Sequence, residues 1–230
     1  MWTRTVNGRV LHFYLAGINN QNFLMRDKET RSWWQQITGK AIYGPLQGAA
    51  LSLVLSDELT FGEWRTEYPA GQVLAPVAKY VKEYDSNWEP DVAKLPVVIS
   101  FPGTELKSRD VVIGLTRNGS ARAYPWEAFA KQSPVVDRVN GTPLLLVLGP
   151  DGKSFRVFLS RIDGRDAEFF LQADSKDWML VDSTTASQWN FQGCAISGPA
   201  QGKCLDRIPA LKDYWFDWRN YHPDTTVYKR

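Results

Sequence analysis

Thiol chemistry has two candidate residues in this chain of 230 amino acids, Cys194 and Cys204. A thiolate attacks disulfides and binds soft metals, so such a pair could form a redox or metal site. The Gly-Pro-x-x-Gly string between them, Gly198 to Gly202, could fold the chain back and allow a disulfide worth roughly 2–3 kcal/mol. Three interpretations stay open: a disulfide, two buried free thiols, or a metal or redox role. The third is weakened because no histidine or acidic ligand stands at the tight spacing of a zinc site.

The two histidines do not complete a catalytic set. His12 alternates with Leu11 and Phe13 on an expected strand, so it is predicted to face solvent. His222 lies in a turn-like Tyr-His-Pro-Asp run and is predicted to be a turn or packing residue. No Ser-His-Asp or Cys-His arrangement can be assembled, which favours a protein without catalytic activity.

Methionine and aspartate recur near each other as Met25 with Asp27 and as Met179 with Asp182. Methionine binds soft metals, but beside leucine on a strand it is usually a core residue. We therefore predict no metal ligand and no catalytic residue, and the sequence leaves any cofactor unknown.

One sequence pattern occurs twice. Residues 27–51 and 182–205 share aspartate, threonine, serine, tryptophan and a Gly-Pro-x-x-Gly string in the same order, and Glu63-Trp64-Arg65 is then matched by Asp217-Trp218-Arg219. A repeat of this length indicates two related structural units that pack on each other. We predict an approximate two-fold, with a shared binding site where the two Gly-Pro turns approach each other. Its candidate residues are Asp27, Trp34, Gly44, Gly48, Asp182, Trp189, Gly198 and Gly202.

The first of these units lacks the front that the second one has. The alignment sets Met1 against Val157, so the stretch from about Leu95 to Arg156 has no earlier counterpart. We expect a truncated first unit over residues 1–84, a linker over 85–94 and a more complete unit over 95–230. A second subunit or a homo-oligomer would then complete the first unit, whereas the alternative is a unit that was asymmetric from the start.

The elements that must position these residues are short strands. Branched and aromatic runs bounded by turn residues predict strands at 10–15, 111–116, 143–148, 154–159, 167–171 and 178–181. Asn118-Gly119, Asp151-Gly152 and Asp163-Gly164 are typical of tight hairpins. Helical spacing indicates short helices at 125–131 and 76–84. The expected fold class is mainly β with a few short helices.

Tryptophan is abundant, with ten residues. Trp34, Trp189, Trp64 and Trp218 recur in both units and are predicted to close each core. The tryptophans without a repeat partner are better candidates for a binding face: Trp33, Trp88, Trp126, Trp178 and Trp215.

Charge and hydropathy exclude several classes of protein. The net charge is +2 and the basic residues are scattered, so the sequence predicts no nucleic-acid partner. No apolar run approaches the ~20 residues of a spanning helix, so no transmembrane segment is expected. The start, Met1 to Arg4, has no apolar stretch typical of a secretory signal.

The order of motifs resembles a known family. Leu24-Met25-Arg26-Asp27, Ser32-Trp33-Trp34-Gln35, Gly44-Pro45 and Gly48, followed by Trp64 and Pro69, is similar to the bacterial domain of unknown function 3179, DUF3179. The resemblance covers nearly the whole chain. It implies no established activity, and it suggests an exported or periplasmic protein.

The resemblance also implies motifs that this chain has lost. Relatives are expected to run Ala-Tyr-Pro, then a His-Glu string, then Gly-x-Pro and a strand ending in Cys-Pro-x-Cys. Here Ala123-Tyr124-Pro125 fits, but the His-Glu string falls on residues 132–137, beginning with Gln132, and Cys-Pro-x-Cys falls on 149–152 as Gly-Pro-Asp-Gly. The leading expectation is therefore a degenerate, noncatalytic binding or scaffold protein. The alternative is a thiol- or metal-linked redox protein whose missing front or partner subunit carries the cysteine motif.

Overall fold

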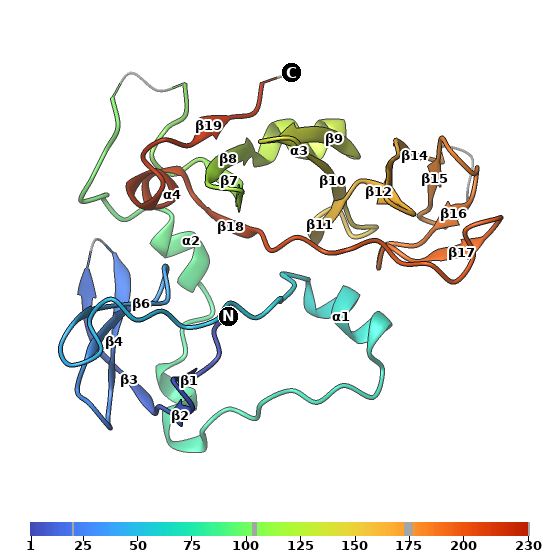
Figure 1. Ribbon diagram of the computed structural model, residues 1–230. Helices are drawn as coiled ribbons and strands as arrows, with labels where there is room; N and C mark the ends of the chain where they lie inside the picture. The colour runs from blue at the N-terminus through green and yellow to red at the C-terminus, as the bar shows by residue number, and fades with distance from the viewer. Residues whose placement is uncertain (20, 103–104, 173–176, 230) are drawn as a thin grey trace.

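A computed structural model describes residues 1–19, 21–102, 105–172 and 177–229. These residues form mostly short antiparallel strands in several small sheets, with a few short helices between them (Figure 1). The predicted fold class, mainly β with short helices, is confirmed.

The N-terminal part holds a hairpin and a four-stranded sheet. The strands are β1 (Thr5–Val6), β2 (Arg9–Val10), β3 (Phe13–Asn19), β4 (Asn22–Asp27), β5 (Trp33–Gln35) and β6 (Lys40–Tyr43). The sheet has the order β3-β4-β5-β6 and is antiparallel throughout. The single strand expected at 10–15 is split at Leu11 and His12, because Leu11 turns fully into the core beside Trp34.

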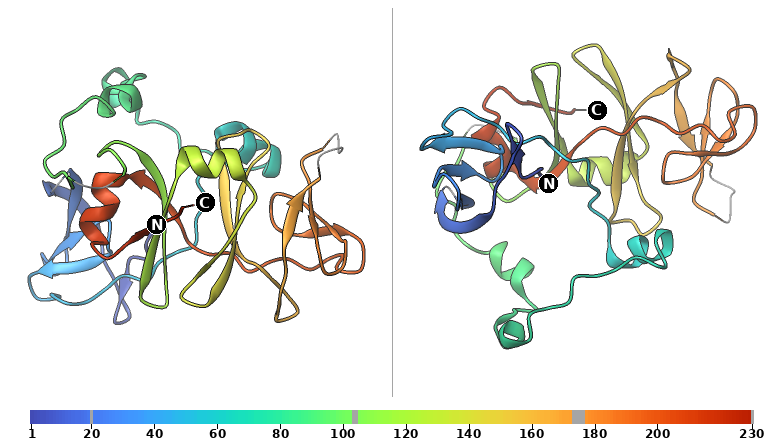
Figure 2. Two further views of the ribbon diagram at one scale, coloured as in Figure 1. Left: turned by 90° about the horizontal axis from the view of Figure 1, so that it is seen from above. Right: turned by 60° about the horizontal axis from the view of Figure 1, so that its bottom comes forward.

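A long connection with little packing follows. It contains α1 (Phe61–Glu67), the 3₁₀ helix η1 (Ala78–Glu83) and α2 (Trp88–Val92). We call residues 69–100 the arm; Figures 1 and 2 show it looping away from the rest of the molecule. Its apolar side chains are largely exposed, with Leu74 at 95%. The helix expected at 76–84 forms as η1, and α2 lies inside the expected linker.

The central part carries the longest strands. It comprises β7 (Val111–Arg117), β8 (Ser120–Pro125), α3 (Trp126–Gln132), β9 (Val135–Val139), β10 (Thr142–Leu148) and β11 (Phe155–Leu159). The strand β10 lies between β11 and β9, and residues 142–147 are all buried. The expected hairpin at Asn118-Gly119 joins β7 to β8, and both residues have positive φ, as this turn requires.

The C-terminal strands follow the same order as the N-terminal ones. They are β12 (Arg161–Ile162), β13 (Arg165–Asp166), β14 (Phe169–Leu171), β15 (Leu180–Asp182), β16 (Gln188–Trp189) and β17 (Ala195–Ser197). A hairpin, β12-β13, precedes an antiparallel sheet of order β14-β15-β16-β17, just as β1-β2 precedes β3-β4-β5-β6.

The chain then returns to the central part through β18 (Leu211–Tyr214), α4 (Trp215–Tyr221) and β19 (Thr226–Val227). The strand β18 pairs antiparallel with β7, whereas β19 pairs parallel with β8. The helix α4 lays the Trp218 indole directly over Gly114, where any side chain on β7 would collide with the ring. The glycine is therefore what allows α4 to dock on this sheet.

The predicted meeting of the two Gly-Pro turns is not found. The sheets β3–β6 and β14–β17, which carry these turns, lie at opposite ends of the molecule with the central part between them (Figures 1 and 2). The central strands β7 to β11 separate them, so no site forms between Gly44 and Gly198. Whether the two parts obey a two-fold stays a prediction.

Candidate functional site

Residues 149–152, onto which the sequence resemblance places a Cys-Pro-x-Cys motif, form a closed turn between β10 and β11. Asp151 accepts hydrogen bonds from the hydroxyls of Thr60 and Ser154, both at 2.6 Å, and from the Ser154 backbone N–H at 2.8 Å. Burial opposes ionisation of this carboxyl, but these donors outweigh it and lower the pKa of Asp151 to about 2. The Asp151 carboxylate of this turn thus holds the side chain of Thr60, which is the N-cap residue of α1.

Gln132 and Ser133, where the sequence resemblance places the start of a His-Glu string, also form hydrogen bonds within the fold. The Gln132 side-chain oxygen accepts from the Tyr228 hydroxyl at 3.3 Å, and the Ser133 hydroxyl accepts from the Leu148 backbone N–H at 2.7 Å. Neither side chain can act as the base that a histidine or glutamate would supply. Ser133 connects the end of α3 to β10, and Gln132 connects it to the C-terminal segment.

A cleft of about 670 Å³ opens next to this turn. Its volume is in the range of small-molecule sites. It is formed mainly by β18, the segment that leads into α1, and α2 of the arm, with one residue each from β7 and from the turn between β10 and β11. The lining residues are Glu58, Leu59, Thr60, Trp88, Glu89, Val92, Val111, Lys153, Lys212, Asp213 and Tyr214.

Glu58 and Lys212 are partly withdrawn from water in this cleft. The Glu58 carboxylate accepts from the Lys212 backbone N–H at 3.3 Å, and burial raises its pKa. The Lys212 ammonium sits 3.6 Å from the centre of the Trp126 ring, and burial lowers its pKa. Both shifts favour the neutral form of the group, because a low-dielectric site disfavours charge of either sign.

The Asp213 carboxyl is largely buried in the cleft. No N–H or O–H group of the described structure donates to its Oδ2 atom, and a side-chain hydrogen bond joins it to the Asp217 carboxyl when the pair holds a proton. Burial, followed by the charge of the nearby Asp217, raises the pKa of Asp213 to about 8. Asp217 in turn accepts a hydrogen bond from Asn22 at the start of β4, so this carboxyl pair lies where the N-terminal sheet meets α4.

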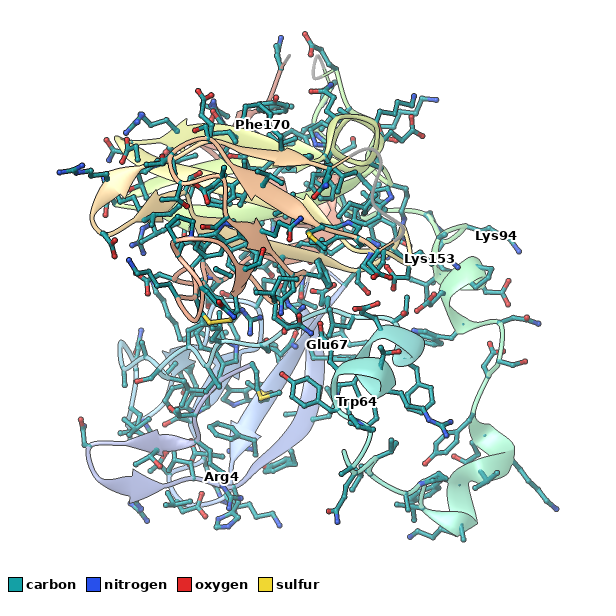
Figure 3. The ribbon with its side chains drawn as sticks, turned by 90° about the vertical axis from the view of Figure 1, so that its right-hand side faces the viewer. Arg4, Trp64, Glu67, Lys94, Lys153 and Phe170 are labelled. Atoms are coloured by element: carbon teal, nitrogen blue, oxygen red, sulfur yellow. A yellow bond between two sulfur atoms is a disulfide. The ribbon has the colours of Figure 1, made fainter. Side chains whose placement is uncertain are left out.

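Ion pairs join the segment before and within α1 to the central part. Arg156 on β11, with a side chain that is 2% exposed, contacts Asp57 at 2.9 Å and Glu67 at 2.5 Å, and Asp57 also pairs with Arg207. Figure 3 shows Glu67 on the side of α1 toward this body and Trp64 on the opposite side of the helix. These contacts fix one wall of the cleft.

The residues predicted from the repeat form two separate, similar networks. Asp27 accepts from the Trp34 indole at 2.8 Å and from the Ser32 N–H at 3.1 Å, while Asp182 accepts from Trp189 at 2.9 Å and from the Ser187 N–H at 3.1 Å. Burial alone would raise the pKa of each aspartate, but the donated hydrogen bonds lower it. All four aspartate and tryptophan side chains are at most 1% exposed, so none offers a ligand an accessible atom.

The glycines of the same prediction serve the turns. Gly44 and Gly198 have positive φ, and a Cβ there would lie 2.8 Å and 2.7 Å from the Cα of Ser32 and Ser187. Gly48 and Gly202 also have positive φ, with open space around them. Their conformation accounts for the recurring Gly-Pro-x-x-Gly string as backbone geometry.

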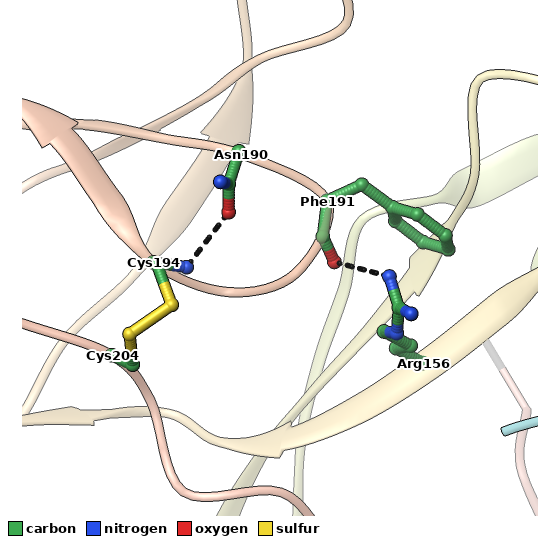
Figure 4. Close-up of a disulfide and its surroundings, with 5 residues drawn as sticks. All are labelled: Arg156, Asn190, Phe191, Cys194 and Cys204. Atoms are coloured by element: carbon green, nitrogen blue, oxygen red, sulfur yellow. Dashed lines mark hydrogen bonds between the residues drawn. A yellow bond between two sulfur atoms is a disulfide. The ribbon is translucent and has the colours of Figure 1, made fainter. Parts of the chain in front are cut away.

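Cys194 and Cys204 form a disulfide, the first of the three interpretations (Figure 4). The Asn190 side chain accepts from the Cys194 N–H at 2.9 Å and shapes the turn beside it. The corresponding residues of the N-terminal sheet, Lys40 and Ala50, form the same isolated β-bridge without thiols. The bridge therefore adds a covalent link to a pairing that the backbone makes in both sheets.

Some of the other sequence predictions are confirmed, and one is wrong. His12 is solvent-facing, with its Nδ1 at 2.7 Å from Glu29, and His222 packs on Trp218 with 3.9 Å between ring centres, as expected. Trp88 does line the cleft, but Trp215 is only 2% exposed, so it is not part of a binding face. Its place in α4 against the β7–β8 hairpin explains the burial.

Sequence reasoning missed Glu58, Lys212 and Asp213. Their neighbours come from segments far apart along the chain, and no local pattern marks them. Within the described residues, no group of three His, Cys, Asp or Glu side chains could hold a metal ion, and no described helix is long and apolar enough to cross a membrane.

Comparison with known proteins gives one match. The family described as "Protein of unknown function (DUF3179)" matches residues 1–225 of the 230. No curated protein and no solved structure matches the chain significantly. Since the family match spans nearly the whole sequence, the chain belongs to the DUF3179 family of proteins of unknown function.

Proposed function

We propose that this chain is a noncatalytic binding protein whose ligand site is the cleft beside β18. The observation that carries the proposal is the cleft itself: about 670 Å³, lined by two lysines, three acidic residues and the exposed indole of Trp88. A pocket of this size with a few converging polar groups is the usual form of a small-molecule site.

The noncatalytic part of the proposal rests on the positions that carry the family's motifs. Glycines replace both cysteines at 149 and 152, and glutamine replaces the histidine at 132. Glycine can neither attack a disulfide nor bind a metal. The remaining polar group of the turn, Asp151, is held by Thr60 and Ser154 and is not directed at a substrate.

A pair of variants on one exposed helix tests the site. Glu89 lines the cleft, whereas Asp91, two residues later on α2, does not. Ligand-observed NMR with a library of small molecules should give hits that Glu89→Trp abolishes by filling the cleft and that Asp91→Trp leaves unchanged. Hits that survive Glu89→Trp, or a library without a saturable hit, would contradict the proposal.

A second candidate, a thiol-linked redox protein, rests on the exposure of Cys204 at the edge of the C-terminal sheet. An accessible disulfide can be attacked by an external thiolate. If thioredoxin-type dithiols reduce the bond while the chain stays folded, this function gains support. If the bond yields only after unfolding in urea, it is structural. Thiol labelling followed by mass spectrometry separates the two results.

A further inference from the structure

We infer that the cleft takes a small organic anion of the carboxylate class, held by the ammonium groups of Lys153 and Lys212. The inference rests on the proposed binding function and names its ligand. Three observations support it: the contacts of the two lysines, the ionisation of the acidic residues in the cleft, and the apolar surface between them.

Both lysines are available to a ligand. Over the described part of the chain, no carboxylate lies within ion-pair distance of either ammonium, whereas Lys94, Lys203 and Lys229 each have an acidic partner. The Lys212 ammonium lies against the Trp126 ring, and the carboxylates of Glu58, Glu89 and Asp151 act on its charge from beyond ion-pair distance. Burial lowers the pKa of Lys212, and an anion in direct contact would oppose that effect by stabilising the ammonium. Two ammonium groups that line one cavity with no carboxylate in direct contact can each pair with the carboxylate of a ligand.

Two of the three acidic lining residues, Glu58 and Asp213, oppose the lysines less than exposed carboxylates would. Burial disfavours the ionised form of Glu58 and of Asp213, and a protonated carboxyl can donate a hydrogen bond to an anion. The Asp213 carboxyl already shares a hydrogen bond with Asp217, so it shapes the floor of the cleft and is not counted as a ligand contact. Glu89 is the one acidic lining residue on the exposed arm, at the side of the cleft that α2 forms.

The rest of the lining favours an organic body over an inorganic ion. Leu59, Val92 and Val111 supply aliphatic surface, and Trp88 and Tyr214 supply aromatic rings. A cavity of about 670 Å³ is also far larger than a phosphate or sulfate needs. A carboxylate on a planar or aliphatic skeleton uses both kinds of surface.

Three probes with one ring separate the ligand classes. Benzoate, benzylamine and benzyl alcohol carry a negative, a positive and a neutral group on the same skeleton. Isothermal titration or NMR titration of the full chain should show benzoate binding at least about tenfold tighter than the other two, the difference expected from one favourable charge pair.

Lysine variants tie that preference to the cleft. Lys153→Met and Lys212→Met should each weaken benzoate binding about tenfold without changing benzylamine binding, and methionine at 212 keeps an apolar contact with the Trp126 ring. Lys131→Met, on the exposed face of α3 and outside the cleft, should change nothing. A benzoate affinity that is unaltered by both cleft variants overturns the inference.

The controls also separate this inference from the proposed function. If benzylamine or benzyl alcohol binds as tightly as benzoate and Glu89→Trp abolishes that binding, the cleft is a ligand site and only the anion class is wrong. If none of the three probes gives saturable binding, both the inference and the proposed function are contradicted.

Discussion

Asp27 and Asp182 each bring a charge into a fully buried position, and each is surrounded by donors. The indole of the tryptophan seven residues later and the N–H of the serine five residues later both point at the carboxylate. This recurrence explains why aspartate, serine and tryptophan keep the same order in both sheets. The shared pattern encodes a fold element, because the donors and the acceptor lie in one short segment.

Asp182→Ala should lower the free energy of unfolding by about 2–3 kcal/mol, since the buried donors of Trp189 and Ser187 lose a charged acceptor. Urea unfolding followed by tryptophan fluorescence measures this change. Asp27→Ala should behave alike in the N-terminal sheet, while the exposed Asp206→Ala should stay within about 0.5 kcal/mol of the parent chain. Equal effects at all three positions would refute the structural role.

The Asp213 carboxyl predicts a pH dependence of stability. Its pKa is raised to about 8 in the folded chain, against an ordinary value of 3.8, so the folded state holds a proton that the unfolded state has released. Between these values stability should fall as pH rises, by at most about 1.4 kcal/mol per pH unit from this group. Above about pH 8 the contribution is constant.

Asp213→Asn should remove that slope. The groups that face Asp213 are Asp217 of α4 and Glu58 of the segment before α1. Relative to the parent chain, the variant should therefore gain stability steadily from pH 5 to pH 8, as measured by urea unfolding at each pH. A difference in stability that is the same at pH 5 and pH 8 would show that Asp213 does not hold its proton.

The sequence repeat singled out Asp182 and Trp189 but assigned them to a binding site, whereas the structure buries them in a hydrogen-bond network. These two residues lie seven positions apart, so their recurrence could be seen along the chain, but their burial could not, and nothing in the sequence marked the cleft. Glu58 and Lys212 are 154 residues apart in the sequence and come together only in the folded chain. The burial that shifts the pKa of both groups depends on how β18 packs. A charged residue in an irregular segment has no local sign of that environment.

At the scale of elements, α1 and α4 carry similar sequences and have different surroundings. Residues 215–218 of α4 are buried on the β7–β8 hairpin, whereas α1 has no buried residue. Trp218 rests on Gly114, but Trp64 has no such strand beneath it and packs beside Gly71 and Phe61. The same tryptophan motif therefore contributes very differently in the two places.

Trp218→Ala should cost about 3–5 kcal/mol of stability, the range for removing a large buried aromatic side chain. Trp64→Ala should cost less than about half of that, because its ring is not in a core. Thermal and urea unfolding of the two variants give the comparison. A larger loss at Trp64 than at Trp218 would mean that α1 is covered in solution in a way that the structure does not show.

The strands that carry turn signals could be predicted, and those that rely on a distant partner could not. Asn118-Gly119 marked the β7–β8 hairpin because its two positive φ angles demand such residues. The strand β18 contains Lys212 and Asp213 and has no strand-like alternation; it is extended because β7 offers it hydrogen bonds. Tertiary pairing overrode weak local preference there.

At the scale of the whole molecule, the first third of the chain is fastened to the rest by polar contacts. Arg156 contacts Asp57 and Glu67, Thr60 donates to Asp151, and Asn22 donates to Asp217. Arg156→Met should lower stability by about 3–5 kcal/mol, because Glu67 would remain as a buried charge without its partner. Combining it with Glu67→Gln should recover part of the loss; a purely additive double variant in urea unfolding would deny the coupling.

The arm contributes few of the polar contacts that hold the first third of the chain to the rest. The described arm is joined to residues outside it by hydrogen bonds from the Gln21 side chain to the Pro96 carbonyl, from Arg109 to the Leu95 carbonyl and from the Gly71 N–H to the Tyr68 carbonyl. Leu74 is 95% exposed and therefore accessible to a protease that cleaves after large apolar residues. Cleavage at Leu74 should therefore leave two fragments that elute together in size-exclusion chromatography and separate only in denaturant. The contacts of Arg156, Asp151 and Asp217 do not depend on an unbroken arm, so the two fragments should also assemble when they are expressed as separate polypeptides.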